Sequence, residues 1–229
     1  MNFTTLLWDV DGTLLDFKAA EKAAVKALFR EFSFGECTDE MVRRYSRINE
    51  IFWQRLERNE LTKPQILVGR FEQFFTEVGV PASMAPAFND RYQLALGDTI
   101  AFRDDSISIV RSLRGKVKQY AVTNGTVAAQ DKKLTNSGLK DLLDGAFLSE
   151  GVGAEKPNIA FFDAVFNVIQ PMDLSKILII GDSLTSDIRG GNNAGIKTCW
   201  YNPDRLPPQP GYCIDYTVSD LHEILKIVG

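Results

Sequence analysis

The sequence contains a single histidine, His222, and this scarcity excludes several kinds of catalytic chemistry. A Ser-His-Asp triad needs a histidine as its general base, and many zinc sites use histidine ligands. His222 lies among apolar residues at helical spacing near the end of the chain, on the side of that helix expected to face solvent. The sequence therefore argues against a serine-hydrolase triad and against a histidine zinc site.

Cysteine is also scarce, and long apolar runs are absent. Cys37, Cys199 and Cys213 are odd in number and form no C-x-x-C pair, which suits reduced, buried thiols in a cytosolic protein. No apolar run approaches the roughly 20 residues that a membrane span needs, and no basic segment followed by an apolar one resembles a secretory signal. We expect a cytoplasmic protein that does not bind a membrane.

There is no excess of positive charge. The chain has 26 Lys and Arg against 30 Asp and Glu, a formal net charge of -4. A polymeric nucleic acid or an anionic membrane is therefore an improbable partner, and small-molecule chemistry fits better. With 229 residues, 45% of them hydrophobic, the chain is long enough for one large domain or for a core with a smaller module.

Residues 17–100 show helical periodicity and no convincing strand. Apolar positions recur at helical spacing, and Gly35, Thr38 and Gly79 supply the breaks. Four helices are predicted here, over residues 19–32, 39–56, 63–78 and 83–96. The phenylalanines at positions 71, 74 and 75 are expected to form their core.

The rest of the chain alternates between strands and helices. Strands are predicted near residues 6–8, 118–123, 145–148, 177–180 and 197–201, and helices over 105–114, 127–137, 159–168, 186–194 and 221–228. Strands separated by helices imply right-handed crossovers and a parallel sheet. We predict an α/β fold, a Rossmann-like parallel sheet with helices on both faces, formed by residues 1–16 and 101–229. An all-helical cap domain, residues 17–100, is inserted after the first strand.

Two acids follow the first predicted strand. The apolar run Leu6–Trp8 stops at Asp9, and Asp11-Gly12 then marks a turn. One interpretation is a hairpin turn with solvated acids. The residues after Gly12 do not alternate as a returning strand would, so a buried strand that ends in two carboxylates is favoured. In an open parallel sheet, the carboxyl ends of the strands are where ligands bind.

Polar residues also follow the later strands. Thr123-Asn124 comes after the second strand, Lys156 after the third, and Asp182 and Asp187 after the fourth. Each has a plainer local explanation, as a helix cap, a solvated lysine or a surface acid. These separate explanations would all have to be true at consecutive strand ends of one sheet, which is an improbable coincidence. The sequence therefore predicts one polar site at that edge.

These motifs resemble those of the haloacid dehalogenase superfamily of phosphohydrolases over essentially the whole chain. The helical insert resembles that family's four-helix cap of the C1 type. Finer details are similar to the pyrimidine 5′-nucleotidase branch. They are Arg47-Ile48-Asn49, the segments 122–125 and 179–188, Cys199-Trp200 and Asn202-Pro203.

The resemblance implies a Mg²⁺ cofactor. Two like charges about 4 Å apart repel by roughly 4 kcal/mol at an effective dielectric constant near 20, so converging carboxylates need a cation. Oxygen ligands and a phosphate substrate suit Mg²⁺. The expected ligands are the Asp9 and Asp182 carboxylates, the Asp11 backbone carbonyl, and Asp187 directly or through water.

The resemblance also implies roles in catalysis. Asp9 would be the nucleophile that forms an aspartyl phosphate, and Asp11 the general acid and base. Thr123, Asn124 and Lys156 would bind the phosphoryl group, with Lys156 also orienting the nucleophile.

The expected substrate is a small phosphomonoester. A nucleoside 5′-monophosphate with a pyrimidine base is favoured, and Phe17, Asn49, Trp53 and Arg70 of the cap could contact the base. A phosphoglycolate or sugar-phosphate phosphatase, or a mutase, would share the same motifs, and a dehalogenase fits the acids less well. A regulatory or binding module with a residual site is the alternative from another class. A monomer and a dimer are equally compatible with the sequence.

Overall fold

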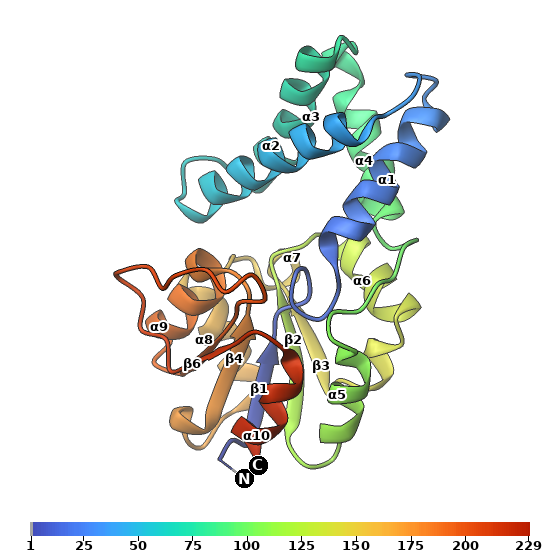
Figure 1. Ribbon diagram of the computed structural model, residues 1–229. Coiled ribbons are helices and arrows are strands. Elements are labelled where there is room, and N and C mark those ends of the chain that lie inside the picture. Colours follow the sequence, from blue (N-terminus) through green and yellow to red (C-terminus); the bar gives the residue numbers. More distant parts are fainter. Residues whose placement is uncertain (1) are drawn as a thin grey trace. The chain divides into compact units, whose positions relative to one another are not determined.

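A computed structural model describes residues 2–229 of the chain (Figure 1). The chain divides into two compact units. One consists of the residues up to Asp16 together with Ala101–Gly229, and the other is Phe17–Ile100. We call them the sheet unit and the helical unit. The helical unit interrupts the sequence of the sheet unit once, directly after its first strand.

The sheet unit contains a six-stranded sheet in which every neighbouring pair is parallel, in the order β3-β2-β1-β4-β5-β6. Its central strand is β1, where Leu7 pairs with Tyr120 on one side and Ile179 on the other. The strand order reverses between β1 and β4, and in open parallel sheets ligands bind outside the carboxyl ends at such a point. The strands are β1 (Thr5–Trp8), β2 (Lys118–Thr123), β3 (Gly145–Leu148), β4 (Ile177–Gly181), β5 (Lys197–Tyr201) and β6 (Tyr216–Val218).

Helices cover both faces of this sheet. Figure 1 shows α8 and α9 on one side and α5 and α6 on the other. The helices are α5 (Ser106–Leu113), α6 (Val127–Asn136), α7 (Ser149–Val152), α8 (Ile159–Ile169), α9 (Arg189–Asn193) and α10 (Ile224–Val228), with short helical turns at Leu139–Asp141, Leu174–Lys176, Leu184–Ile188 and Leu221–Glu223. The predicted α/β fold with a parallel sheet and helices on both faces is confirmed.

Apolar packing holds the sheet unit together. Phe162 and Val165 of α8 pack with Leu7, Ile177 and Ile179 of the central strands, and all five side chains are fully buried. A strand covered on both faces has to be apolar at every position, which explains the continuous run in β4. The polar residues of this region are consequently confined to the strand ends.

The helical unit consists of four helices around an aromatic core. The helices are α1 (Phe17–Glu31), α2 (Asp39–Glu57), α3 (Lys63–Val78) and α4 (Ala85–Ala95), and the short turn Ala82–Met84 precedes α4. Phe71, Phe74 and Phe75 are fully buried, as predicted, and pack with Phe29 and Phe88. Within residues 2–229, no helix is both long enough and apolar enough to pass through a bilayer.

Three elements of the sheet unit differ from the prediction. The sixth strand, β6, with three residues, and the short helix α7, with four, are absent from the prediction. The prediction of one helix over residues 186–194 is wrong at its start. A π-helical turn, Leu184–Ile188, comes first, and α9 begins only at Arg189. The turn has the i to i+5 hydrogen bond of a π-helix, because the Ile188 N–H donates to the Ser183 carbonyl at 3.1 Å, and the Ser183 side chain caps it by accepting from the Ser186 N–H.

The cysteines are free thiols. Cys37 and Cys199 are buried, as expected, whereas Cys213 is exposed, so the expectation of three buried thiols is wrong for that residue. Cys213 lies in the segment just before the edge strand β6.

Candidate active site

Asp9 is the first residue after the central strand. Its N–H donates to the carbonyl of Ile180 at 2.9 Å, which continues the β1–β4 ladder by one residue. Because β1 and β4 are parallel and in register, with Trp8 opposite Ile180, their next side chains emerge at the same edge. Asp9 and Asp182 therefore leave neighbouring strands at the point where the strand order reverses.

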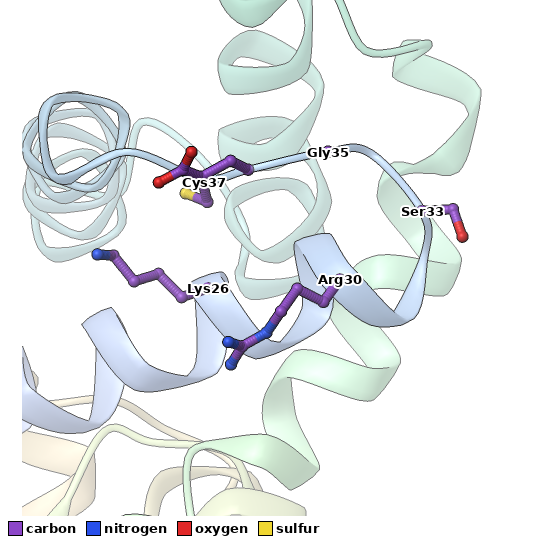
Figure 2. Close-up of a pocket in the computed structure, with 6 residues that line it drawn as sticks. Lys26, Arg30, Ser33, Gly35 and Cys37 are labelled. Carbon is purple, nitrogen blue, oxygen red and sulfur yellow. The ribbon is translucent and has the colours of Figure 1, made fainter.

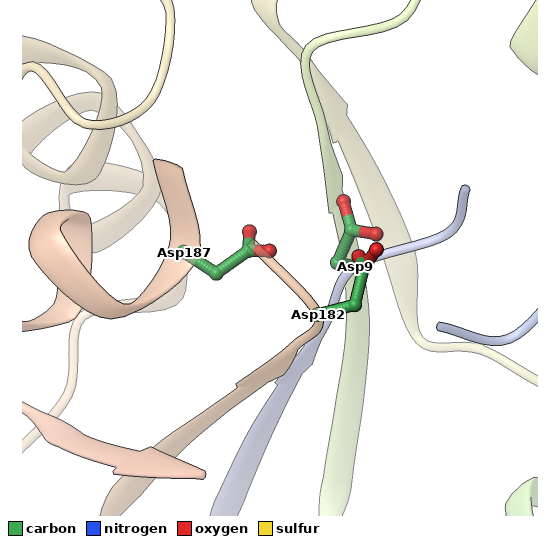
Figure 3. Close-up of side chains that lie close together, drawn as sticks. All are labelled: Asp9, Asp182 and Asp187. Atoms are coloured by element: carbon green, nitrogen blue, oxygen red, sulfur yellow. The ribbon is translucent and has the colours of Figure 1, made fainter. Parts of the chain in front are cut away.

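Three carboxylates converge there. Asp9, Asp182 and Asp187 each offer an oxygen atom, and these atoms lie within 4.8 Å of one another. Figure 3 shows Asp9 coming from the end of β1 and the other two from the segment after β4. Asp9 and Asp187 are buried, while part of Asp182 faces solvent. We call these residues the carboxylate cluster.

The electrostatics of the cluster favour a bound cation. Burial raises the pKa of Asp9 well above its usual value; Lys156 opposes this, and the charges of Asp187 and Asp182 add to it. Desolvation of the carboxylate and the nearby charge of Asp187 raise the pKa of Asp182 to about 7. Both shifts mean that the cluster resists carrying full negative charge on its own. The predicted cofactor, Mg²⁺, fits this set of oxygen donors.

A bulge-like turn places Asp187. The residue lies in the π-helical turn Leu184–Ile188, and its carboxylate accepts a hydrogen bond from the Ser183 N–H at 3.2 Å. A Cβ atom at Gly181 would lie 2.2 Å from the Asp187 carboxyl carbon. Only glycine at position 181 leaves the carboxylate room to reach back toward the strand end. Turns of the π type occur frequently at functional sites.

Lys156 links two members of the cluster. Its Nζ donates to Asp9 Oδ1 at 2.9 Å, to Asp187 Oδ1 at 2.6 Å and to the carbonyl of Val122 at 2.7 Å. The side chain is 1% exposed. Burial disfavours the ammonium, but the two carboxylates outweigh this and raise the pKa of Lys156. The structure thus brings a permanent positive charge against Asp9.

Thr123, the last residue of β2, and Asn124, which follows it, have different surroundings. The Thr123 hydroxyl is buried and accepts a hydrogen bond from the Gly125 N–H at 3.1 Å. The Asn124 amide bonds to the backbone of Lys156 in both directions, with both distances 2.8 Å. The Asn124 side chain therefore fixes the segment that carries Lys156, and its own polar atoms are already engaged.

Thr13 is a site residue to which the sequence assigned no role. Its hydroxyl donates to Asp182 Oδ1 at 3.2 Å and accepts from the Asp182 N–H at 3.0 Å. Gly12 adopts a φ of +96°, and a Cβ atom there would lie 2.4 Å from Asp182 Oδ2. The turn after β1 is therefore shaped around Asp182. The Gly-Thr pair that follows Asp11 was the available sequence signal.

In the part of the chain that the structure describes, the carboxylate cluster does not include the Asp11 carboxylate. The Asp11 carboxylate contacts Gln130 and Lys133 of α6 instead. Sequence reasoning missed both residues, because a glutamine and a lysine three positions apart on an amphipathic helix carry no distinctive signal.

The residues suggested as contacts for a base lie in the helical unit. Asn49 and Arg70 are 4% and 2% exposed, and Arg70 Nη1 donates to Asn49 Oδ1 at 2.6 Å. Asn49 in turn donates to Glu21 Oε2 at 2.9 Å. Both side chains thus belong to a buried hydrogen-bond network inside this unit. Phe17 and Trp53 are half-buried.

The helical unit also has a surface hollow of roughly 550 Å³, lined in part by Lys26, Arg30 and Cys37 (Figure 2). Lys26 is paired with Asp39 at 2.6 Å. Burial raises the pKa of the Cys37 thiol to about 11, so it is a poor nucleophile at neutral pH. The hollow lacks the converging charges of the carboxylate cluster, which remains the candidate active site.

Comparison with known proteins identifies the family. The family model described as haloacid dehalogenase-like hydrolase matches residues 6–201. The chain is 36% identical to the HAD-hydrolase YfnB of Bacillus subtilis (strain 168), over 99% of this chain and 96% of that protein. This chain also resembles a crystal structure of YfnB bound to magnesium, with a TM-score of 0.92 and 35% identity over 100% of both chains.

Two further relatives are pyrimidine 5′-nucleotidases. PynA of Streptococcus pneumoniae (strain ATCC BAA-255 / R6) is 35% identical, with 98% of this chain and 96% of that protein covered. YjjG of Escherichia coli (strain K12) is 31% identical, with 100% of this chain and 99% of that protein covered. The chain belongs to the haloacid dehalogenase-like hydrolase family. The resemblance predicted from its motifs, to this superfamily and to the pyrimidine 5′-nucleotidase branch, is confirmed.

Proposed function

We propose that the protein is a Mg²⁺-dependent phosphomonoesterase that works through an aspartyl phosphate on Asp9. The observation that carries this proposal is the carboxylate cluster with Lys156 bonded to Asp9, at the reversal point of a parallel sheet. A carboxylate held next to a fixed ammonium and a cation site is equipped to attack a phosphate dianion. Without those positive charges, repulsion would keep the two anions apart.

The metal would be held by the residues that the sequence predicted. They are the carboxylates of Asp9 and Asp182, Asp187 directly or through water, and the backbone carbonyl of Asp11. When bound, Mg²⁺ supplies neutralising charge for the carboxylates and for the phosphoryl oxygens.

The protein side chains then divide the reaction between them. An Asp9 oxygen attacks phosphorus, the bond to the leaving oxygen breaks, and Asp11 gives that oxygen its proton. In the second half, Asp11 takes a proton from the water that cleaves the aspartyl phosphate, which releases inorganic phosphate and restores Asp9. Thr123 and neighbouring N–H groups hold phosphoryl oxygens, and Lys156 balances charge on Asp9 and the transferring group.

We infer that the substrate is a nucleoside 5′-monophosphate with a pyrimidine base. The support is the full-length similarity to PynA and YjjG, both named pyrimidine 5′-nucleotidases. The sheet unit handles only the phosphoryl group, so leaving-group selection is assigned to the helical unit acting as a cap. Because Asn49 and Arg70 are engaged in its interior, Phe17 and Trp53 are the better candidates to contact a base.

The test is phosphate release from a panel of nucleoside monophosphates, sugar phosphates and phosphoglycolate, with and without Mg²⁺. We expect Mg²⁺-dependent turnover with the highest kcat/KM on UMP, dUMP or dTMP. The Asp9→Asn variant should retain less than about a thousandth of the activity, since loss of a catalytic nucleophile costs several orders of magnitude. Asp163→Asn, at an exposed position of α8, is the matched control and should be unaffected.

Different failures have different meanings. Faster hydrolysis of sugar phosphates than of every nucleotide would overturn the substrate and keep the mechanism. An Asp9→Asn enzyme with near-normal turnover would overturn the covalent mechanism. Absence of any Mg²⁺-dependent turnover would favour a regulatory or binding role.

A further inference from the structure

Helix α6 holds the carboxylate of Asp11 with two donors. Lys133 Nζ lies 2.5 Å from Asp11 Oδ1, and Gln130 Nε2 lies 2.5 Å from Asp11 Oδ2. Each carboxylate oxygen therefore has its own partner. Gln130 and Lys133 are three positions apart, so they extend from the same face of the helix. One donor would leave the carboxylate free to rotate about its terminal bond, whereas two donors fix its plane.

The two donors are more deeply buried than the acid that they hold. Gln130 is 0% exposed and Lys133 is 1% exposed. The Asp11 side chain is 22% exposed. Removing a lysine ammonium from water is costly unless a carboxylate compensates for it. The arrangement thus presents a partly open carboxylate on a rigid, buried support, which suits a group that must meet a substrate.

The local backbone is shaped to allow this contact. A Cβ atom at Gly125 would lie 2.1 Å from Gln130 Nε2 and 2.8 Å from its Cδ. Thr126 then caps α6 by accepting a hydrogen bond from the Ala129 N–H at 3.3 Å. The glycine after Thr123-Asn124 therefore makes room for the Gln130 side chain, and the cap sets where the helix begins. Together they direct α6 toward the loop after β1.

We propose that Lys133 and Gln130 are positioning residues that align Asp11 for the proton transfers of the reaction, and this rests on the function proposed above. A proton moves efficiently only when donor and acceptor heavy atoms approach to roughly 2.6–3.2 Å. The aspartate side chain has two rotatable bonds, so an unsupported Asp11 would occupy several orientations. The two donors select one of them before substrate arrives.

The leaving group provides a readout that a merely structural role would not affect. A nucleoside 5′-phosphate releases an alkoxide, which needs a proton as it departs, whereas p-nitrophenyl phosphate releases a stable phenolate. The value of kcat/KM reports the steps up to leaving-group departure. Misalignment of Asp11 should therefore lower kcat/KM for a nucleotide much more than for p-nitrophenyl phosphate. General loss of folded enzyme would lower both values equally.

The experiment compares Lys133→Met, Gln130→Met and Lys133→Arg with Lys140→Met in the Mg²⁺-loaded enzyme. Lys140 is an exposed lysine paired with Asp131 at 2.8 Å, so it matches the substitution without touching the site. We expect Lys133→Met to lower kcat/KM for UMP by about 30-fold or more, a part of the 10²–10⁴ that acid–base catalysis contributes, and for p-nitrophenyl phosphate by less than about 5-fold. Gln130→Met should show a smaller loss with the same selectivity. Lys133→Arg should recover most of the nucleotide activity, and Lys140→Met should match the parent.

A double-mutant cycle completes the test. In an Asp11→Asn background, Lys133→Met should cause no further leaving-group-dependent loss, because the group that it aligns is no longer an acid. Equal losses on both substrates, or unchanged activity in Lys133→Met and Gln130→Met, would overturn the positioning role. The proposed function would still stand in that case, provided that the parent enzyme is active. A parent enzyme inactive on both substrates would overturn the two together. If Lys133→Met fails to fold, Gln130→Met decides the question alone, because it keeps the ion pair.

Discussion

Thr13 and Asp182 exchange two hydrogen bonds, although they lie 169 positions apart in the sequence. The Thr13 hydroxyl donates to Oδ1 of the aspartate and accepts from its N–H. This reciprocal pair ties the loop after β1 to the loop after β4. It also sets the orientation of Asp182, the most exposed residue of the carboxylate cluster.

Thr13→Val should therefore weaken Mg²⁺ binding. The substitution keeps the shape of the side chain and removes both hydrogen bonds, and loss of a group that orients a metal ligand typically costs 10–100-fold in affinity. We expect a Kd for Mg²⁺ higher by about 10-fold in isothermal titration calorimetry. Thr217→Val, at an exposed position of β6, is the control. An unchanged Kd would show that Asp182 needs no support from Thr13.

Lys156→Met should lower kcat strongly and also destabilise the fold. The variant leaves Asp9 and Asp187 together without the ammonium that separates their charges, and breaking a buried ion pair costs about 3–5 kcal/mol. Transition-state stabilisation of this kind is worth about 10²–10³ in kcat. Urea unfolding in EDTA and phosphate-release assays measure the two effects.

The exposed pair of Lys118 and Asp144, at 2.7 Å, is the matched control for that experiment. Lys118→Met should change the free energy of unfolding by less than about 1 kcal/mol, because surface ion pairs contribute little. Similar losses for the two variants would contradict the role assigned to Lys156.

Mg²⁺ should stabilise the protein more at high pH than at low pH. The pKa of Asp182 is raised from 3.8 to about 7 in the folded chain without metal. The contribution of Asp182 to the free energy of unfolding is therefore fully present below pH 3.8, the pKa in the unfolded chain, and is lost as the pH rises through about 7. Mg²⁺ competes with the proton for the same oxygens, so the increase in Tm on adding Mg²⁺ should be larger near about pH 8 than near about pH 5.5. Equal increases at both pH values would exclude Asp182 as a ligand.

Arg70→Met should destabilise the helical unit selectively. Besides Asn49, Arg70 donates to Asn89 Oδ1 at 3.3 Å, and the network ends at Glu21, whose carboxylate also accepts a hydrogen bond from Ser46. Burial raises the pKa of Glu21. Removing the Arg70 guanidinium leaves the buried Asn49 Oδ1 without its donor, at a cost of about 1–3 kcal/mol, whereas Asn89 Oδ1 keeps the hydrogen bond from Gln93 Nε2 at 2.9 Å.

Hydrogen exchange would locate the effect of that substitution. We expect faster exchange in α2, α3 and α4 and little change in the strands. Arg91→Met, which removes an exposed pair with Glu31 at 2.8 Å, should leave exchange nearly unchanged. Faster exchange throughout both units would mean that they unfold as one cooperative body.

The sequence is most informative where a polar residue interrupts a buried strand. Asp9 was identifiable because three apolar residues precede it, and Asp182 because β4 is apolar to its end. Parallel strands must deliver such residues to one edge, so the convergence of Asp9, Lys156 and Asp182 followed from topology. The aromatic core of the helical unit followed equally directly from spacing.

Other features depend on contacts that no local pattern encodes. Lys133 lies on the buried face of α6 next to Leu134, where an apolar residue would be expected. Its partner, Asp11, is 122 positions away. The sequence made Arg70 a candidate for contact with a base. Its actual partners, Asn49 and Asn89, come from different helices.

Backbone hydrogen bonds join the two points at which the chain leaves and re-enters the sheet unit. The Asp16 N–H donates to the carbonyl of Ala101 at 2.8 Å, and the Arg103 N–H donates to that of Leu14 at 3.1 Å. The sheet unit thus fastens the two ends of the interruption side by side. For an interruption with fixed ends, closure entropy rises only by about 0.6 kcal/mol for each doubling of length. Helices between these two points can therefore be lengthened, shortened or exchanged over evolutionary time while the sheet keeps its register.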